Sequence, residues 1–260
     1  MNMTCTYILT VCIGSIALLH SLQVSAAGKA SGRIEDWQNP AIFERNRLQM
    51  RSSFKTDSPT LSLNGLWKFK WYATPEERSR DFFSVRTDVS GWDEMPVPGM
   101  WELNGYGDPV YLNIGYAWRG HYDNNPPFVP TDRNHVGQYK RTFSVDRSWN
   151  GKDIFLHIGS ATSNVRVWIN GHEVGYSEDS KLEAEFDITK FVRTGTGNEV
   201  AFEIFRWCDG TYLEDQDFWR ITGIARDTYI YARPTDRVED IQVEASASGE
   251  LSWKILTTCG

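Results

Sequence analysis

The chain has 260 residues, 40% of them apolar, and a net charge of -7. This length can hold one large or two modest domains with a substantial core. Because no basic block interrupts the acidic sequence, the electrostatic footprint of a nucleic-acid-binding protein is missing, so we expect no nucleic-acid partner. The 11 Trp, 11 Tyr and 13 Phe residues suit core packing, and Trp and Tyr also suit stacking on sugars.

Residues 1–26 have the pattern of a secretory signal peptide. An apolar run over residues 7–19 is followed by the small-residue pattern Val24-Ser25-Ala26, and no charge precedes Lys29. The run is shorter than the about 20 residues that span a bilayer. We therefore expect an exported protein, periplasmic or secreted, with no membrane span after signal cleavage.

The cysteines argue against a disulfide scaffold. Of the four, Cys5 and Cys12 fall within the expected signal, which leaves Cys208 and Cys259. Two thiols cannot staple a small fold, and no Cys or His spacing suggests zinc.

The first segments after the signal differ in character. Residues 27–60 have mixed charge and an Asn39-Pro40 break, which predicts a mostly irregular arm. Residues 62–72 alternate Lys or Leu with aromatic residues, the period of a β-strand with one aromatic face. Residues 75–84 begin with Pro75 and carry acids in the first turn, which predicts one short helix.

The clearest hairpin lies in the middle of the chain. Val165, Val167 and Ile169 share one face of a predicted strand, and Asn170-Gly171 supplies the two residues of a type I′ turn. Further strands are expected at residues 137–145, 152–158, 199–207 and 226–234, and a long loop over residues 105–134.

Many short alternating strands without βα units predict an all-β fold, a jelly-roll or galactose-binding-like antiparallel β-sandwich over residues 61–236. A new alternating pattern begins near Val238. We expect residues 237–260 to be the truncated start of a second β domain.

Residues 209–219 carry four carboxylates, Asp209, Glu214, Asp215 and Asp217. Asp215 and Asp217 would lie on one face of a strand, at roughly the 5 to 5.5 Å spacing of the acid pair in a retaining glycosidase. Oxygen ligands in this segment also suit a hard cation, although the spacing is not that of a calcium loop. The third reading makes Glu214, Asp215 and Asp217 scaffold groups that bind backbone N–H groups or pair with arginines.

Aromatic residues flank these acids. Trp207, Tyr212 and Trp219 could pack in the core or serve as platforms for sugar rings. Packing is the commoner role.

Four longer motifs point to a family. They are EDWQNPAIFERNR, NPPFVPTDRNHVGQYKRTF, VWINGHEVGYSEDSKLEAEFDIT and RWCDGTYLEDQDFWRITGIARDTYIYARP, which cover nearly all of residues 35–234 in this order. Together they resemble the N-terminal region of the large β-galactosidases of glycoside hydrolase family 2. The resemblance implies a jelly-roll sugar-binding domain followed by an immunoglobulin-like domain, whose truncated start would be residues 237–260, and then a catalytic (β/α)8 barrel.

The resemblance also implies an activity. Such enzymes hydrolyse terminal non-reducing β-D-galactose residues with retention, using two glutamates on the barrel with magnesium and sodium nearby. A barrel needs roughly 250 residues, and only 26 follow Pro234. We therefore expect no catalytic residue in this chain, no turnover by the chain alone, and a need for a barrel in cis or in another chain.

Two positions carry over from the resemblance. Asn113, in PVYLNIGYAW, corresponds to the family Asn that contacts galactose, and Asp209, in RWCDG, to the Asp that binds both a galactose hydroxyl and the active-site sodium. An amide can donate to and accept from a hydroxyl, and a carboxylate accepts from a hydroxyl or binds a cation. The plainer alternatives are a turn-forming Asn and an Asp that caps its own loop before Gly210. Residues 114–118 depart from the family pattern, which leaves the reach of the Asn113 loop open.

Two other functions remain open on the sequence alone. The chain could be a non-catalytic carbohydrate-binding β-sandwich module, which would hold a β-galactoside by aromatic stacking and hydrogen bonds. It could also be a fragment that folds poorly because a docking face is left exposed.

Overall fold

The computed structural model describes residues 34–50, 58–214 and 216–259. The described residues belong to one compact unit, Ile34–Gly260. The expected signal peptide therefore lies outside the described residues, and so does Asp215.

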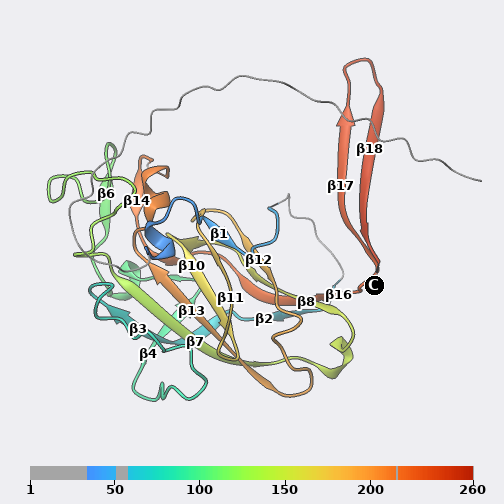
Figure 1. The fold of residues 1–260 in the computed structure, drawn as a ribbon, viewed down its shortest axis with the longest axis horizontal. Coiled ribbons are helices and arrows are strands. Elements are labelled where there is room, and N and C mark those ends of the chain that lie inside the picture. Colours follow the sequence, from blue (N-terminus) through green and yellow to red (C-terminus); the bar gives the residue numbers. More distant parts are fainter. Residues whose placement is uncertain (1–33, 51–57, 215, 260) are drawn as a thin grey trace, which may run out of the picture. The chain divides into compact units, whose positions relative to one another are not determined.

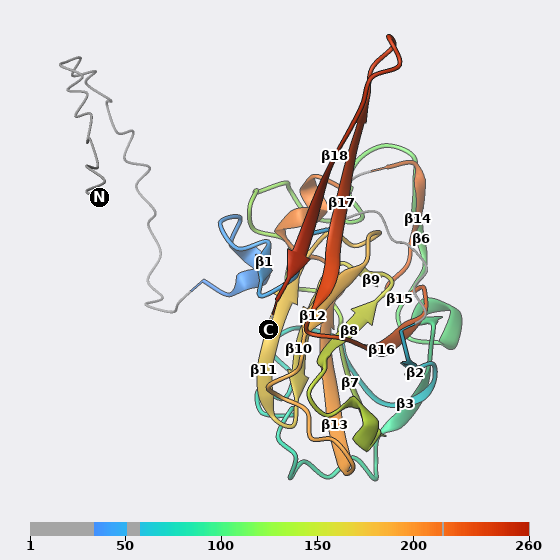
Figure 2. The ribbon, with the colours of Figure 1, turned by 90° about the vertical axis from the view of Figure 1, so that its right-hand side faces the viewer.

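Two antiparallel sheets build the described unit (Figure 1, Figure 2). The larger has the order β1-β11-β10-β13-β7-β3-β4, formed by Glu44–Arg45, His172–Ser177, Val165–Ile169, Gly197–Phe205, Val136–Ser144, Gly65–Tyr72 and Asp93–Val97. The smaller has the order β12-β8-β16-β2, formed by Ala184–Asp187, Asp153–Ile158, Thr228–Arg233 and Thr60–Ser62.

Short elements complete the fold. Two small sheets have the orders β5-β15-β9 and β14-β6, formed by Gly99–Met100, Gly223–Ile224 and Ala161–Thr162, and by Phe218–Arg220 and Val110–Leu112. Four single 3-10 turns are η1 to η4, formed by Asp36–Gln38, Glu102–Asn104, Arg147–Trp149 and Asp209–Tyr212.

The main core lies between the two large sheets. Trp67 of β3 stacks on Phe202 of β13 with ring centroids 4.8 Å apart, and this layer packs in one cluster with Leu156, Phe186 and Ile230 of the smaller sheet. All five side chains are buried because alternate residues of each strand face the opposite sheet. The prediction of an all-β antiparallel sandwich is confirmed.

The hairpin prediction is also confirmed. β10 and β11 pair in antiparallel register around Asn170 and Gly171, whose φ angles of 52° and 81° are those of a type I′ turn. Val165, Val167 and Ile169 are buried in the sandwich core, as their alternation predicts.

The prediction of a helix over residues 75–84 is wrong. This segment forms turns, and the described residues contain no α-helix. Its Phe82 is buried against Trp168, with centroids 5.2 Å apart, and the Arg78 guanidinium donates to the Pro75 carbonyl. A helix of only ten residues has marginal stability in water. These contacts with the outer face of the larger sheet therefore decide the conformation of residues 75–84.

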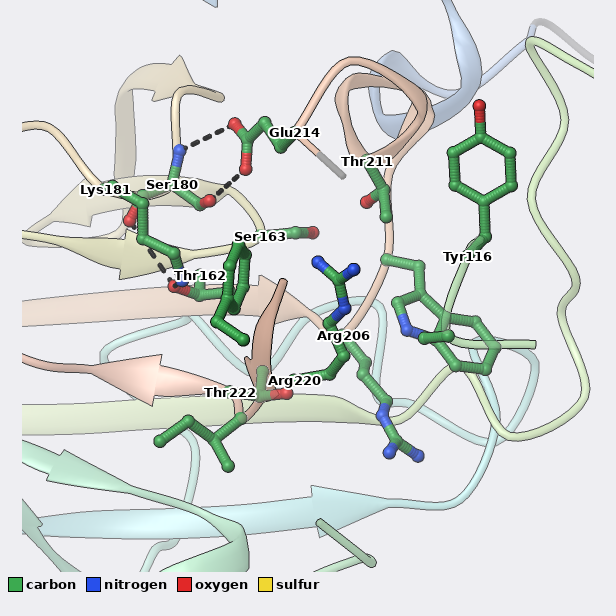
Figure 3. A pocket seen from close by; sticks show the side chains of 14 residues that line it. Tyr116, Thr162, Ser163, Ser180, Lys181, Arg206, Thr211, Glu214, Arg220 and Thr222 are labelled. Carbon is green, nitrogen blue, oxygen red and sulfur yellow. Dashed lines mark hydrogen bonds between the residues drawn. The ribbon is translucent and has the colours of Figure 1, made fainter. Parts of the chain in front are cut away.

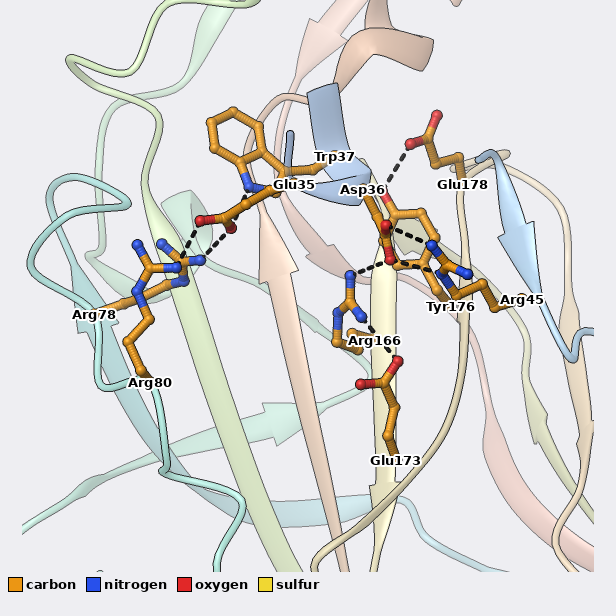
Figure 4. A network of polar contacts seen from close by, with 10 residues as sticks. All are labelled: Glu35, Asp36, Trp37, Arg45, Arg78, Arg80, Arg166, Glu173, Tyr176 and Glu178. Atoms are coloured by element: carbon orange, nitrogen blue, oxygen red, sulfur yellow. Dashed lines mark hydrogen bonds and ion pairs between the residues drawn. The ribbon is translucent and has the colours of Figure 1, made fainter. Parts of the chain in front are cut away.

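Ion pairs fix the described part of the arm to the larger sheet (Figure 4). Asp36 accepts hydrogen bonds from Arg45 Nε at 2.9 Å and from Arg166 Nη2 at 2.7 Å. The next residue, Trp37, stacks on Phe205 at the end of β13 with centroids 4.8 Å apart. The arm therefore contacts the strand that leads to Asp209.

The last two strands, β17 (Arg237–Ala245) and β18 (Leu251–Thr258), form a hairpin that pairs only with itself among the described strands. Opposite pairs such as Ile241 with Ile255 and Val243 with Trp253 give it an exposed apolar face. Its assignment to an immunoglobulin-like domain stays a prediction.

Candidate functional site

The Asp209 loop is ordered by its own hydrogen bonds. β13 ends at Phe205, and the side-chain amide of Asn134 then clamps Trp207 by accepting from its N–H at 2.8 Å and donating to its carbonyl at 3.1 Å. The Cys208 N–H donates to Thr211 Oγ1 at 3.1 Å and so closes the first turn of η4. These contacts hold Asp209 in a fixed place at the end of the sandwich.

Asp209 lies in a cluster of three ligand-type side chains. Its side chain is 8% exposed, and ligand atoms of Glu178, Cys208 and Asp209 all lie within 4.8 Å of one another. Tyr176 donates to Glu178 Oε1 at 2.7 Å. The Asp209 Oδ1 atom is buried without a hydrogen-bond partner among the described residues.

The electrostatics of this cluster favour a proton or a cation between the two carboxyls. Burial raises the pKa of Glu178 to about 8, and the charge of Asp209 adds to this effect. Burial also raises the pKa of Asp209 and holds the pKa of the Cys208 thiol well above its usual range. Because a protonated thiol is a poor ligand, the carboxylate oxygens are the groups available to a hard cation.

Gly210 is needed beside this cluster. A Cβ at this position would lie 2.6 Å from Glu178 Oε2, closer than such atoms approach. Glycine therefore lets Glu178 lie against the loop that carries Asp209.

Asn113 lies in the bend that follows β6 and is exposed to solvent. The loop after it packs on the Asp209 loop. Trp118 contacts the rings of Trp207 and Tyr212 with centroids 5.3 and 5.2 Å apart, and Tyr212 Oη donates to the Phe128 carbonyl at 2.9 Å. The structure thus brings the two loops together, while the described residues show no direct contact between the Asn113 and Asp209 side chains.

A hollow that opens to solvent lies beside these loops (Figure 3). Hydroxyl and charged groups line much of it, including Thr162, Ser163, Lys181, Glu214 and Arg220, whereas Asn113 and Asp209 do not. Burial lowers the pKa of Lys181. The hollow is therefore separate from the Asp209 cluster.

The other acids of residues 209–219 differ in their contacts. Glu214 accepts from the Ser180 N–H at 2.9 Å and from its hydroxyl, a scaffold role as predicted. Asp217 is exposed and accepts from Tyr111 Oη at 2.6 Å. Since Asp215 lies outside the described residues, the Asp215 and Asp217 pair stays untested.

The aromatic residues also divide. Trp207 is 4% exposed and packs in the core, whereas Trp219 is 57% exposed. Of these two rings, only that of Trp219 is open to a ligand. Sequence reasoning missed Glu178 beside Asp209, because β11 and η4 are distant along the chain and no local motif joins them.

The fold and these loops define an antiparallel β-sandwich with polar groups gathered on the loops at one end. Residues 60–234 match the family described as glycosyl hydrolases family 2, sugar binding domain. The chain belongs to this family.

Curated relatives are β-galactosidases. The chain is 39% identical over 242 residues to the β-galactosidase of Priestia megaterium, a match that covers 86% of this chain and 23% of that protein. It is 41% identical over 197 residues to the β-galactosidase of Halalkalibacterium halodurans, a match that covers 76% of this chain and 19% of that protein. The chain therefore spans about a quarter of these relatives or less.

Solved structures share the fold. A β-glucuronidase from an uncultured Clostridium species matches with a TM-score of 0.60 at 22% identity, covering 82% of this chain and 36% of that chain. A β-glucuronidase from Ruminococcus gnavus matches with a TM-score of 0.56 at 20% identity, covering 81% and 36%. Among the described residues, no helix is long and apolar enough to cross a membrane.

Proposed function

We propose that this chain is the sugar-binding part of a β-galactosidase that removes terminal β-D-galactose with retention. The observation that carries the proposal is the extensive match to enzymes named β-galactosidase. The position of Asp209 supports it, since its buried carboxyl oxygen has no partner among the described residues and the Asn113 loop packs beside it. In this proposal Asn113 and Asp209 contact galactose.

A sodium ion fits the Asp209 cluster chemically. An unpaired carboxylate oxygen next to a second carboxyl is a suitable partial ligand set for a hard monovalent cation. Asp209 would hold the ion together with groups from the rest of the enzyme. The ion would supply a positive charge that offsets the Asp209 carboxylate and attracts the oxygen of a galactose hydroxyl, whereas magnesium would belong to the rest of the enzyme.

The reacting groups would come from a barrel in the same polypeptide or in another chain. Retaining hydrolysis needs a proton donor and a nucleophile on opposite sides of the scissile bond. In this proposal both are barrel glutamates, so the 260-residue chain by itself is inactive. We expect no release of 4-nitrophenol from 4-nitrophenyl β-D-galactoside by the purified chain, and hydrolysis would contradict this division of roles.

A chimera tests the role of Asp209. Residues 34–234 of this chain would replace the matching segment of the Priestia megaterium enzyme, and Asp209→Ala should lower kcat/KM at least about tenfold and reduce the sodium dependence. Asp123→Ala, an exposed acid of the long loop, is the matched control and should leave both unchanged. Equal kinetics for the Asp209 and Asp123 variants would remove Asp209 from the site.

Export is a separate part of the proposal. The apolar run and small-residue pattern of residues 1–26 support a cleaved signal and a periplasmic or secreted location. N-terminal sequencing of the protein recovered from a bacterial host should begin at about residue 27. A mature protein that still begins at Met1 in the cytoplasm would contradict it.

The alternative function is a non-catalytic carbohydrate-binding module. The exposed Trp219 side chain favours it, because stacking on a sugar ring needs no catalytic residue. A native polypeptide with no barrel in cis or in a partner chain would support this alternative.

A further inference from the structure

The hairpin of β17 and β18 has one apolar and one polar face. Because alternate residues of a strand share a face, the residues of one face meet in directly opposed pairs. The apolar face consists of three such pairs, Ile241 with Ile255, Val243 with Trp253, and Ala245 with Leu251. None of these pairs carries a charge. The polar face carries Asp240, Gln242, Glu244 and Lys254.

The apolar face of this hairpin is open to solvent. Ile241 is 57%, Leu251 59% and Trp253 66% exposed, and the hairpin pairs with no other described strand. A two-stranded hairpin has marginal stability in water until its apolar face packs on another element. Contiguous apolar surface of this kind marks a site where another protein surface docks. The face is therefore an interaction surface that needs a partner.

The size and charge of the face fit a second copy of the same chain. Its six side chains together expose roughly 500 Å² of apolar surface. Two such faces packed together would bury about 1,000 Å², which is the lower bound for a specific interface. The chain has a net charge of -7, so two copies repel each other over most of their surfaces. Contact through an uncharged face brings no like charges together.

We propose that two copies of this chain form a dimer by packing the apolar faces of their β17–β18 hairpins against each other. A twofold axis at the central pair, Val243 and Trp253, sets that pair against the same pair of the second copy. The two hairpins then form the layers of a small β-sandwich. Because the buried area is at the lower bound, we expect a dissociation constant of about 10 µM.

Sedimentation velocity of the purified 260-residue chain tests the dimer. Between about 1 and 100 µM, the weight-average mass should rise from that of one copy towards that of two. A reducing agent is needed in the buffer, because Cys259 is free and exposed and could join two copies covalently. The association that remains under these conditions is non-covalent.

One substitution on each face of β18 tests which face is used. Trp253→Thr removes the largest apolar side chain and keeps a residue that favours strands. Because each substitution occurs twice in a twofold interface, it should raise the dissociation constant at least about thirtyfold. Leu256→Thr is the matched control, since Leu256 is 37% exposed and lies on the polar face. It should change the dissociation constant less than about twofold.

Amide hydrogen exchange of the parent chain locates the interface. Amides of residues 237–258 should exchange more slowly at about 100 µM than at about 1 µM, because the dimer protects the hairpin. Amides of β7, which lies within the larger sheet, should exchange equally at both concentrations. This comparison needs no variant, so it tests the dimer even if the Trp253→Thr hairpin does not form.

Several results would overturn the dimer. A parent chain that stays monomeric at about 100 µM would show that a different segment or protein covers the face. Equal dissociation constants for the parent and Trp253→Thr, or equal weakening by Trp253→Thr and Leu256→Thr, would place the contact elsewhere. Growth of the mass beyond two copies would show open strand addition at the hairpin edges instead of a closed pair.

Discussion

Replacing Asp36 by Asn should loosen the arm that contacts the Asp209 strand. The carboxylate of Asp36 accepts from Arg45 and Arg166, and the hydrogen bond from Arg45 is the main cause that lowers its pKa to about 2. Against a usual value of 3.8, this shift corresponds to about 2.5 kcal/mol above pH 4. Because Arg45 is about one third exposed, solvent screening reduces our expectation to about 2 kcal/mol.

Urea denaturation of the parent and Asp36→Asn at pH 7 measures this difference. The folded-state pKa is depressed, so the contribution is complete above pH 3.8 and is lost as the pH falls towards 2. Glu173→Gln is the control, since Glu173 pairs with Arg166 from an exposed position, and should cost less than about 1 kcal/mol. Equal costs for both variants, or a difference that does not shrink below pH 4, would refute the assigned role of Asp36.

Two further predictions concern stability. Burial, with a contribution from Arg206, lowers the pKa of His135 to about 4. Between pH 6.5 and 4 the unfolded chain binds a proton at this histidine and the folded chain does not, so the free energy of unfolding should fall by up to about 3 kcal/mol over this range. His135→Gln should flatten that slope in urea titrations, and an unchanged slope would assign it to other groups. A Cβ at Gly137 would lie 2.3 Å from the Trp101 ring, so Gly137→Ala should cost about 3 kcal/mol or prevent folding. A thermal midpoint equal to that of the parent would contradict this steric argument.

The sequence by itself determined the sandwich. Alternation in β3 and β10 and the Asn170-Gly171 turn are local signals, because a strand shows its buried face in every second residue and a type I′ turn needs two adjacent residues with positive φ. The family motifs added Asn113 and Asp209 as candidate contacts, and their role in binding stays a prediction.

Only the tertiary structure decided which distant groups meet. Asp209 lies beside Glu178, which follows β11, and Trp219 lies beside Tyr111, more than 100 positions earlier in the chain. Residues 75–84 carry local helix signals, yet packing of Phe82 on the sheet replaces the helix with turns. In each case strand register and burial choose the neighbours, and a local sequence pattern holds no information about them.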